Sequence, residues 1–124
     1  MNYEEMSDFE INSLVIRILL RGQFIEYHEQ EVDELLEIVG FDGASSVARF
    51  TTRLGSKQKF DGCNNPSDAW PVIVENKINI TYHSDGDACA EVFCESTNDW
   101  ISVVCKKPLR AAMICFLKMK DAEQ

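Results

Sequence analysis

The chain has 124 residues, of which 45% are hydrophobic and 27% charged, and its formal net charge at pH 7 is −9. This length predicts one domain, residues 1–124, with a core large enough to need no metal or disulfide, and the composition excludes a disordered chain. Twelve basic against 21 acidic residues argue against direct binding of nucleic acid or of an anionic membrane surface, because both attract clustered Lys and Arg.

The amino terminus carries Glu4 and Glu5, where a signal peptide needs basic residues before an apolar run. No apolar stretch approaches the roughly 20 residues of a membrane-spanning helix. We therefore expect a cytoplasmic protein that makes no membrane contact.

The first predicted element is a helix over residues 8–20. Ser7 followed by Glu10 forms a capping box, and the apolar residues behind it recur at helical spacing. Gly22 is expected to end this helix. The apolar face consists of Ile11, Leu14, Val15, Ile18 and Leu19.

The acidic segment from about residue 22 to residue 59 has the weakest patterns. Residues 24–28 fit either a short strand or the approach to a helix. Apolar spacing favours a short helix over residues 31–39, and looser alternation favours a strand over 47–54 followed by a turn at Gly55–Ser56.

Two further helices are predicted, over residues 66–76 and 108–119. Either Asn65 or Ser67 caps the first. With Ser67 as the cap, Pro71 falls at the fourth helical position, where its missing N–H has no intrahelical partner to lose. The second begins at Pro108 and is apolar nearly all round, which predicts a buried helix.

Between these helices, residues 78–82, 88–94 and 100–105 alternate as strands, and turns at 84–87 and 96–99 join them. Three strands with short turns predict an antiparallel meander. The fold class is therefore α+β, with the sheet of residues 78–105 packed against all three helices.

Five cysteines form no close pair that would suit a zinc knuckle, so we interpret them as buried apolar residues and predict neither a metal nor a cofactor. Cys89 and Cys94 are five residues apart in one strand and should face opposite sides of the sheet. The set is Cys63, Cys89, Cys94, Cys105 and Cys115.

The charge is concentrated in residues 1–42, which hold two basic and 11 acidic residues, whereas residues 43–124 are balanced. This excess has two main interpretations: a solvated helix face, or a docking surface for the basic groove of a nucleic-acid-handling protein. A surface for divalent metal is the third. The densest part contains Glu26, Glu29, Glu31, Asp33, Glu34 and Glu37.

No phosphate-binding, nucleophile or metalloprotease motif is present. His83, Asp85 and Asp87 alternate as weak metal ligands would, but turn chemistry explains these residues better. Cys63 precedes a predicted helix start, where a thiol pKa is lowered, but no histidine can be placed beside it. We therefore interpret Asp61–Asp68 as a capped junction between a loop and a helix. Trp70 and Trp100 are interpreted as core or half-exposed packing residues, because acids flank them.

Three blocks of the chain resemble the NinX family of lambdoid phages and enterobacterial prophages. They are Met6–Asn12, Phe60–Ile78 with the run Asp-Gly-Cys-Asn-Asn-Pro-Ser-Asp-Ala-Trp-Pro, and Pro108–Ile114 followed by Phe116–Leu117. The resemblance implies a small phage-encoded accessory protein of the bacterial cytoplasm and no catalytic residue. The residues expected at the family surface are Asp61, Asn64, Asn65, Asp68, Trp70 and Arg110.

The leading hypothesis is a protein-binding accessory factor that uses the acids of residues 1–42 against a host or phage nucleic-acid-handling protein. The alternative is a small metal- or thiol-dependent enzyme built on the Asp61–Asn65 loop and the His83 turn. A homo-oligomer assembled through an edge strand of the sheet is a third hypothesis.

Overall fold

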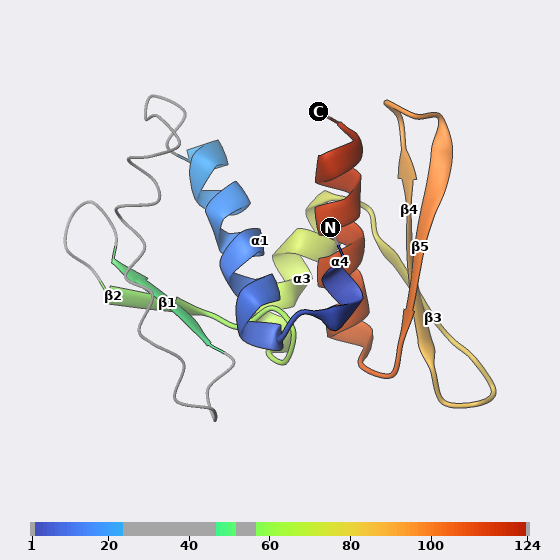
Figure 1. The fold of residues 1–124 in the computed structure, drawn as a ribbon, viewed down its shortest axis with the longest axis horizontal. Helices are drawn as coiled ribbons and strands as arrows, with labels where there is room; N and C mark the ends of the chain where they lie inside the picture. Colours follow the sequence, from blue (N-terminus) through green and yellow to red (C-terminus); the bar gives the residue numbers. More distant parts are fainter. Residues whose placement is uncertain (1, 24–46, 52–56, 124) are drawn as a thin grey trace.

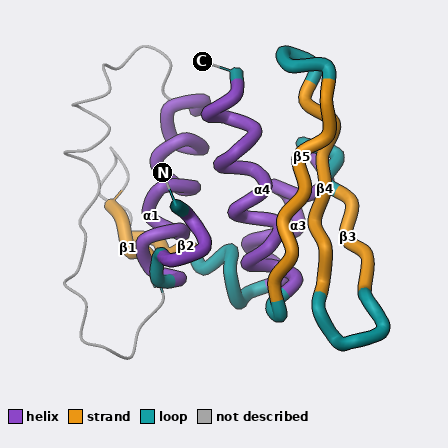
Figure 2. Tube along the Cα trace, turned by 45° about the vertical axis from the view of Figure 1, so that its right-hand side comes forward, coloured by secondary structure: helices purple, strands orange, loops and turns teal. Residues whose placement is uncertain are grey.

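A computed structural model describes residues 2–23, 47–51 and 57–123. Within these residues it confirms the α+β class, with three helices and two small antiparallel sheets (Figures 1 and 2). The segments predicted at 24–28 and 31–39 and the turn predicted at Gly55–Ser56 lie outside the described residues. The strand predicted over 47–54 is described only as far as Thr51, and residues 48–51 of it do form a strand.

The three helices begin where the sequence predicts them. They are α1 (Asp8–Gln23), α3 (Pro66–Glu75) and α4 (Pro108–Ala122), and a short 3-10 turn, η1 (Tyr3–Glu5), precedes them. The Ser7 hydroxyl accepts the Glu10 N–H at 3.1 Å, which confirms the predicted cap of α1. The helix continues to Gln23 and so does not end at Gly22.

The cap of α3 is Asn65, whose side chain accepts the Ser67 N–H at 3.0 Å, and not Ser67 itself. Pro71 therefore lies at the sixth helical position, two residues deeper than if Ser67 were the cap. Because proline has no N–H, the helix lacks one backbone hydrogen bond there. Pro71 and Ser67 are both exposed, so this loss falls on the solvent side of the helix.

The meander is confirmed, with strands β3 (Asn79–Tyr82), β4 (Ala88–Cys94) and β5 (Asp99–Cys105) in the order β3-β4-β5. The turn between β3 and β4 contains Gly86 at φ +94°, a conformation that glycine adopts without strain. A second sheet pairs β1 (Ala48–Thr51) with β2 (Lys57–Phe60). The sequence did not predict β2, because its two lysines and one glutamine give no apolar alternation.

The layers differ from the prediction in one respect. The sheet packs directly on α4, while α1 and α3 pack on other sides of α4 instead of against the sheet (Figure 1). Helix α4 is therefore covered by protein on several sides, which explains its run of buried side chains from Ala111 to Leu117. Small residues allow the close approach of helix and sheet: Ala88 and Ala90 on the sheet and Ala111 and Ala112 on the helix are 0% exposed.

Candidate functional site

The loop at residues 61–65, between β2 and α3, is held against the first turns of α1 by a buried amide. Asn12 is 0% exposed. Its Nδ2 donates to Oδ1 of Asp61 at 2.7 Å, and its Oδ1 accepts the Cys63 N–H at 3.0 Å. One side chain thus fixes both the carboxylate and the backbone of the loop.

The loop residues expected at the family surface also bind one another. Asn64 Nδ2 donates to Asp61 Oδ1 at 3.0 Å and to Asp8 Oδ2 at 3.1 Å. The Asp61 N–H donates to Asp68 Oδ2 at 2.9 Å. The structure therefore brings Asp61, Asn64 and Asp68 together, and their polar atoms hold the loop on the first turns of α1 and α3.

Helix α4 joins the same cluster through Arg110. Its Nη1 donates to Asp8 Oδ1 at 2.6 Å, and its Nη2 donates to the Met6 carbonyl at 2.6 Å and the Glu4 carbonyl at 3.2 Å. Lys107 Nζ also donates to Asp8. Burial alone would raise the pKa of Asp8, but hydrogen bonds from Lys107, Arg110 and Asn64 outweigh it and lower that pKa below its ordinary 3.8.

Tyr3 and Glu4, which precede α1, also bind side chains of α4. Lys118 Nζ donates to Glu4 Oε1 at 2.6 Å, which lowers the pKa of Glu4. The Tyr3 hydroxyl donates to Asp121, and burial together with this bond raises the pKa of Tyr3 to about 12. The three family-like blocks, distant in sequence, thus meet in one polar cluster.

These lowered pKa values predict that acid weakens the fold. The stability from the Glu4 and Asp8 pairs is present above their ordinary pKa values of 4.5 and 3.8 and is lost as the pH falls through the lower folded-state values. We expect the Tm to stay level from about pH 7 to pH 5 and to fall below about pH 4. Calorimetry should find a lower Tm for Asp8→Asn than for the parent protein at pH 7, and a flatter dependence of its Tm on pH. The control Glu5→Gln, at an exposed site, should follow the parent protein. Identical curves of Tm against pH for the parent and both variants would contradict this prediction.

The cysteine in the loop lacks the environment of a nucleophile. Cys63 is 1% exposed. Burial, followed by the nearby charge of Asp8, raises the pKa of its thiol to about 12. The interpretation of Cys63 as a buried thiol is therefore confirmed. The alternative of a helix-start thiolate with a lowered pKa gains no support, because the Asn12 bridge places Cys63 inside the protein.

Thiol labelling should reproduce this order of exposure. Cys89 and Cys105 are half-buried, whereas Cys63, Cys94 and Cys115 are buried. With a disulfide reagent at about pH 8, we expect two fast and three slow thiols in the folded protein, and five fast thiols after denaturation. Peptide mapping that finds Cys63 among the fast thiols would restore the thiol-enzyme alternative.

The His83 turn lies at one end of the sheet, well separated from the Asp61 loop in Figure 1. The His83 N–H donates to the Asp87 carbonyl at 2.7 Å, and the Asp87 N–H donates to Asp85 Oδ1 at 3.0 Å. These are ordinary turn bonds. Within residues 2–23, 47–51 and 57–123, no group of three His, Cys, Asp or Glu side chains could hold a metal ion.

Trp70 does not join the cluster. Trp70 is 64% exposed on α3, and Val74 one turn later is 53% exposed. Trp100 is 54% exposed, so neither tryptophan is a core residue. The six acids from Glu26 to Glu37 lie outside the described residues.

Sequence reasoning assigned no site role to Asn12, Asp8 or Lys107. A signal for Asn12 existed, since it is a polar residue beside Ile11 on the apolar stripe of a helix and so needed internal partners. Lys107 is a poor cap for α4 and makes no capping bond. Its ion pair with Asp8 is a long-range contact that no local pattern encodes.

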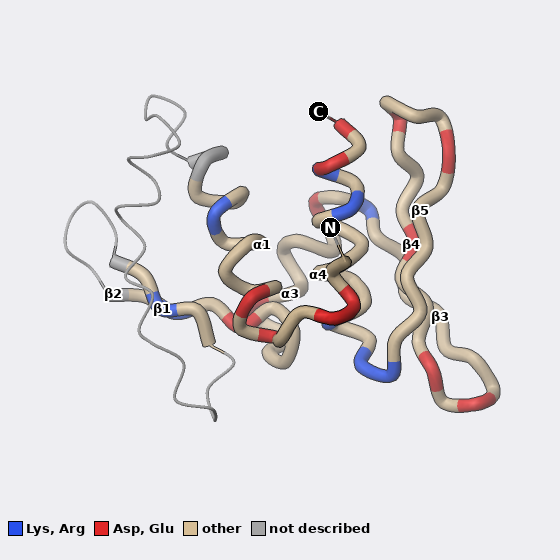
Figure 3. Tube along the Cα trace, in the orientation of Figure 1, with Lys and Arg blue, Asp and Glu red and all other residues tan. Residues whose placement is uncertain are grey.

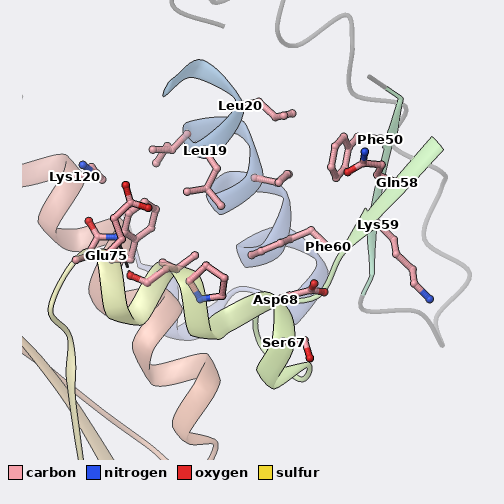
Figure 4. Close-up of a pocket in the computed structure, with 16 residues that line it drawn as sticks. Leu19, Leu20, Phe50, Gln58, Lys59, Phe60, Ser67, Asp68, Glu75 and Lys120 are labelled. Atoms are coloured by element: carbon pink, nitrogen blue, oxygen red, sulfur yellow. Dashed lines mark hydrogen bonds between the residues drawn. The ribbon is translucent and has the colours of Figure 1, made fainter. Parts of the chain in front are cut away.

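A cavity of about 740 Å³ opens between α1, α3 and the β1–β2 hairpin (Figure 4). Apolar walls come from Leu19, Phe50 and Phe60, and charged groups at Lys59 and Glu75 also line it. Among the residues predicted for binding or chemistry that the structure describes, only Asp68 lines it.

In the described part of the chain, no helix is long and apolar enough to cross a membrane. The protein family described as "Bacteriophage P22, NinX" matches residues 2–120. No curated protein and no solved structure matches the chain. Because this family match covers almost the whole chain, the chain belongs to the NinX family of phage proteins.

Proposed function

We propose that this phage accessory protein works by binding another protein and not by catalysis, and that the partner is a basic protein of the host or the phage that handles nucleic acid. The observation that carries the proposal is the uneven charge. Residues 1–42 hold two basic and 11 acidic residues, and six of these acids fall between positions 26 and 37. Such a charge excess speeds and steers encounter with a basic partner.

The described part of this segment sharpens the proposal. Two of its acids serve the fold, because Glu4 pairs with Lys118 and Asp8 pairs with Lys107 and Arg110. These two carboxylates are partly neutralised and are poor candidates for docking. Of the nine acids that remain, the six from Glu26 to Glu37 are the densest group and form the proposed steering charge.

The polar cluster at the Asp61 loop also favours binding over chemistry. Its side chains are engaged in bonds that join α1, α3 and α4, and its thiol is buried with a raised pKa. A reactive site needs a nucleophile or base that can reach substrate. The alternative, a metal- or thiol-dependent enzyme at this loop and the His83 turn, gains no support from this geometry.

The test is affinity capture from host lysate with Glu31, Glu34 and Glu37 all replaced by lysine. We expect the parent protein to retain a partner at low salt and release it at high salt, and the triple variant to retain none at an unchanged Tm. A matched control replaces the exposed Glu5, Glu75 and Glu123 by lysine, which makes the same change in net charge elsewhere. Unaltered capture by the Glu31, Glu34, Glu37 variant would contradict the proposal.

A further inference from the structure

Resting on the proposed protein-binding function, we propose that the outer face of the β3–β5 sheet docks a segment of the partner protein in which an arginine lies between apolar side chains. This face is opposite α4 and carries no described helix or strand (Figure 2). The segment's chemistry follows from the three rows of side chains on the face.

Strand register defines those rows. On β4, Ala88, Ala90, Val92 and Cys94 turn toward α4, so the alternate residues turn outward, as the burial pattern confirms. The outward residues pair across β4 and β5 as Phe93 with Trp100, Glu91 with Ser102, and Cys89 with Val104. On β4 and β5 the face therefore has an aromatic row, a row with Glu91 and a row with Cys89 and Val104, about 7 Å apart. Strand β3 adds Asn79 beside Glu91 and Thr81 beside Cys89.

Three large apolar side chains on this face are exposed to solvent. Trp100 is 54% exposed, Val104 52% and Phe93 41%, and the rings of Phe93 and Trp100 meet edge to face at 5.5 Å. Single exposed apolar residues are common, but a patch of them is typical of an interaction surface. A partner that covers these side chains removes their apolar area from water.

The charge of the sheet selects the partner. Residues 78–105 contain five acids and neither lysine nor arginine (Figure 3). The sheet therefore carries a local excess of negative charge, although basic and acidic residues are equal in number over residues 43–124. Glu91 occupies the middle row, between the aromatic row and the row with Cys89 and Val104. The five acids are Asp85, Asp87, Glu91, Glu95 and Asp99.

An arginine fits this middle row better than other groups. Its guanidinium can form a bidentate bond with the Glu91 carboxylate and stack on the adjacent aromatic rings, which lysine does less well. Nucleic acid is disfavoured because its phosphates would meet carboxylates. A second copy is disfavoured because two such faces would bring their acids together.

The test measures fluorescence anisotropy of a labelled synthetic peptide of alternating leucine and arginine, with a leucine–glutamate peptide as the negative probe. We expect saturable binding of the arginine peptide only. Glu91→Lys and Trp100→Ser should each weaken it about tenfold or more. The matched controls on α3, Glu75→Lys and Trp70→Ser, change the same residue types at exposed positions and should leave it unchanged.

The inference is overturned if the arginine peptide does not bind or if the α3 controls weaken binding equally. It is also overturned if light scattering finds a dimer that Trp100→Ser dissociates. If reversal of Glu31, Glu34 and Glu37 abolishes peptide binding while the sheet variants do not, the inference fails and the proposed function is supported. Unaltered lysate capture by that triple variant contradicts the proposed function independently of the peptide result.

Discussion

Replacing Phe116 by alanine is expected to lower the free energy of unfolding by about 3–5 kcal/mol, enough to unfold a marginally stable protein of this size. Phe116 is 1% exposed on α4 and belongs to the core formed by α4 with the sheet, α1 and α3. The substitution removes a whole ring from the helix on which most of the other elements pack. Urea denaturation followed by circular dichroism measures the loss.

The control is the same substitution at Phe93, whose ring is 41% exposed on the outer sheet face. We expect Phe93→Ala to cost about 1 kcal/mol, chiefly the edge contact with Trp100. Similar losses at the two positions would contradict the assignment of α4 as the centre of the core.

Replacing Asn12 by leucine should lower the free energy of unfolding by about 2–3 kcal/mol although the new side chain is more apolar. The reason is that two groups lose a partner: the Asp61 carboxylate and the buried Cys63 N–H. Each unmet hydrogen bond in a buried site costs more than an average bond contributes. Asn79→Leu, at an exposed strand position, should change stability little.

Asn12→Asp distinguishes the amide's two roles. The aspartate keeps an acceptor for the Cys63 N–H, but it replaces the amide donor to Asp61 with a second carboxylate, which faces the carboxylate of Asp61. Both burial and the like charge raise the pKa of the introduced carboxyl, so the destabilisation should be greatest at about pH 7 and shrink toward about pH 5 as that group binds a proton. A pH-independent loss for Asn12→Asp would show that the amide donor is not what holds the loop.

Much of the architecture follows from local patterns. The three described helices, the exact span of β4 and the turn at Asp85–Gly86 were all predicted, because caps, prolines, glycines and residue periodicity act within a few positions. The opposite facing of Cys89 and Cys94 is likewise confirmed, since it depends only on strand parity. The resemblance of three blocks to NinX is confirmed by the family match.

Other features were missed because they depend on long-range contacts. Strand β2 has a polar sequence and becomes a strand through its pairing with β1. The choice of Asn65 over Ser67 as the cap of α3 is geometric, since either residue type can cap. The reactivity of the Cys63 thiol depends on whether the loop is buried. The bond that holds the loop inside the protein comes from Asn12, 51 positions away in the chain.

By itself, then, the sequence determined the α+β class, most of the element boundaries and the acidic character of residues 1–42. Tertiary structure alone decided that α4 lies between the sheet and the other helices, that Asp8 and Arg110 are used internally, and that the outer sheet face is left open. The physical reason is the distance along the chain over which each interaction acts. Periodicity and caps act over a few residues, whereas burial and ion pairing depend on which distant segments the folded chain brings into contact.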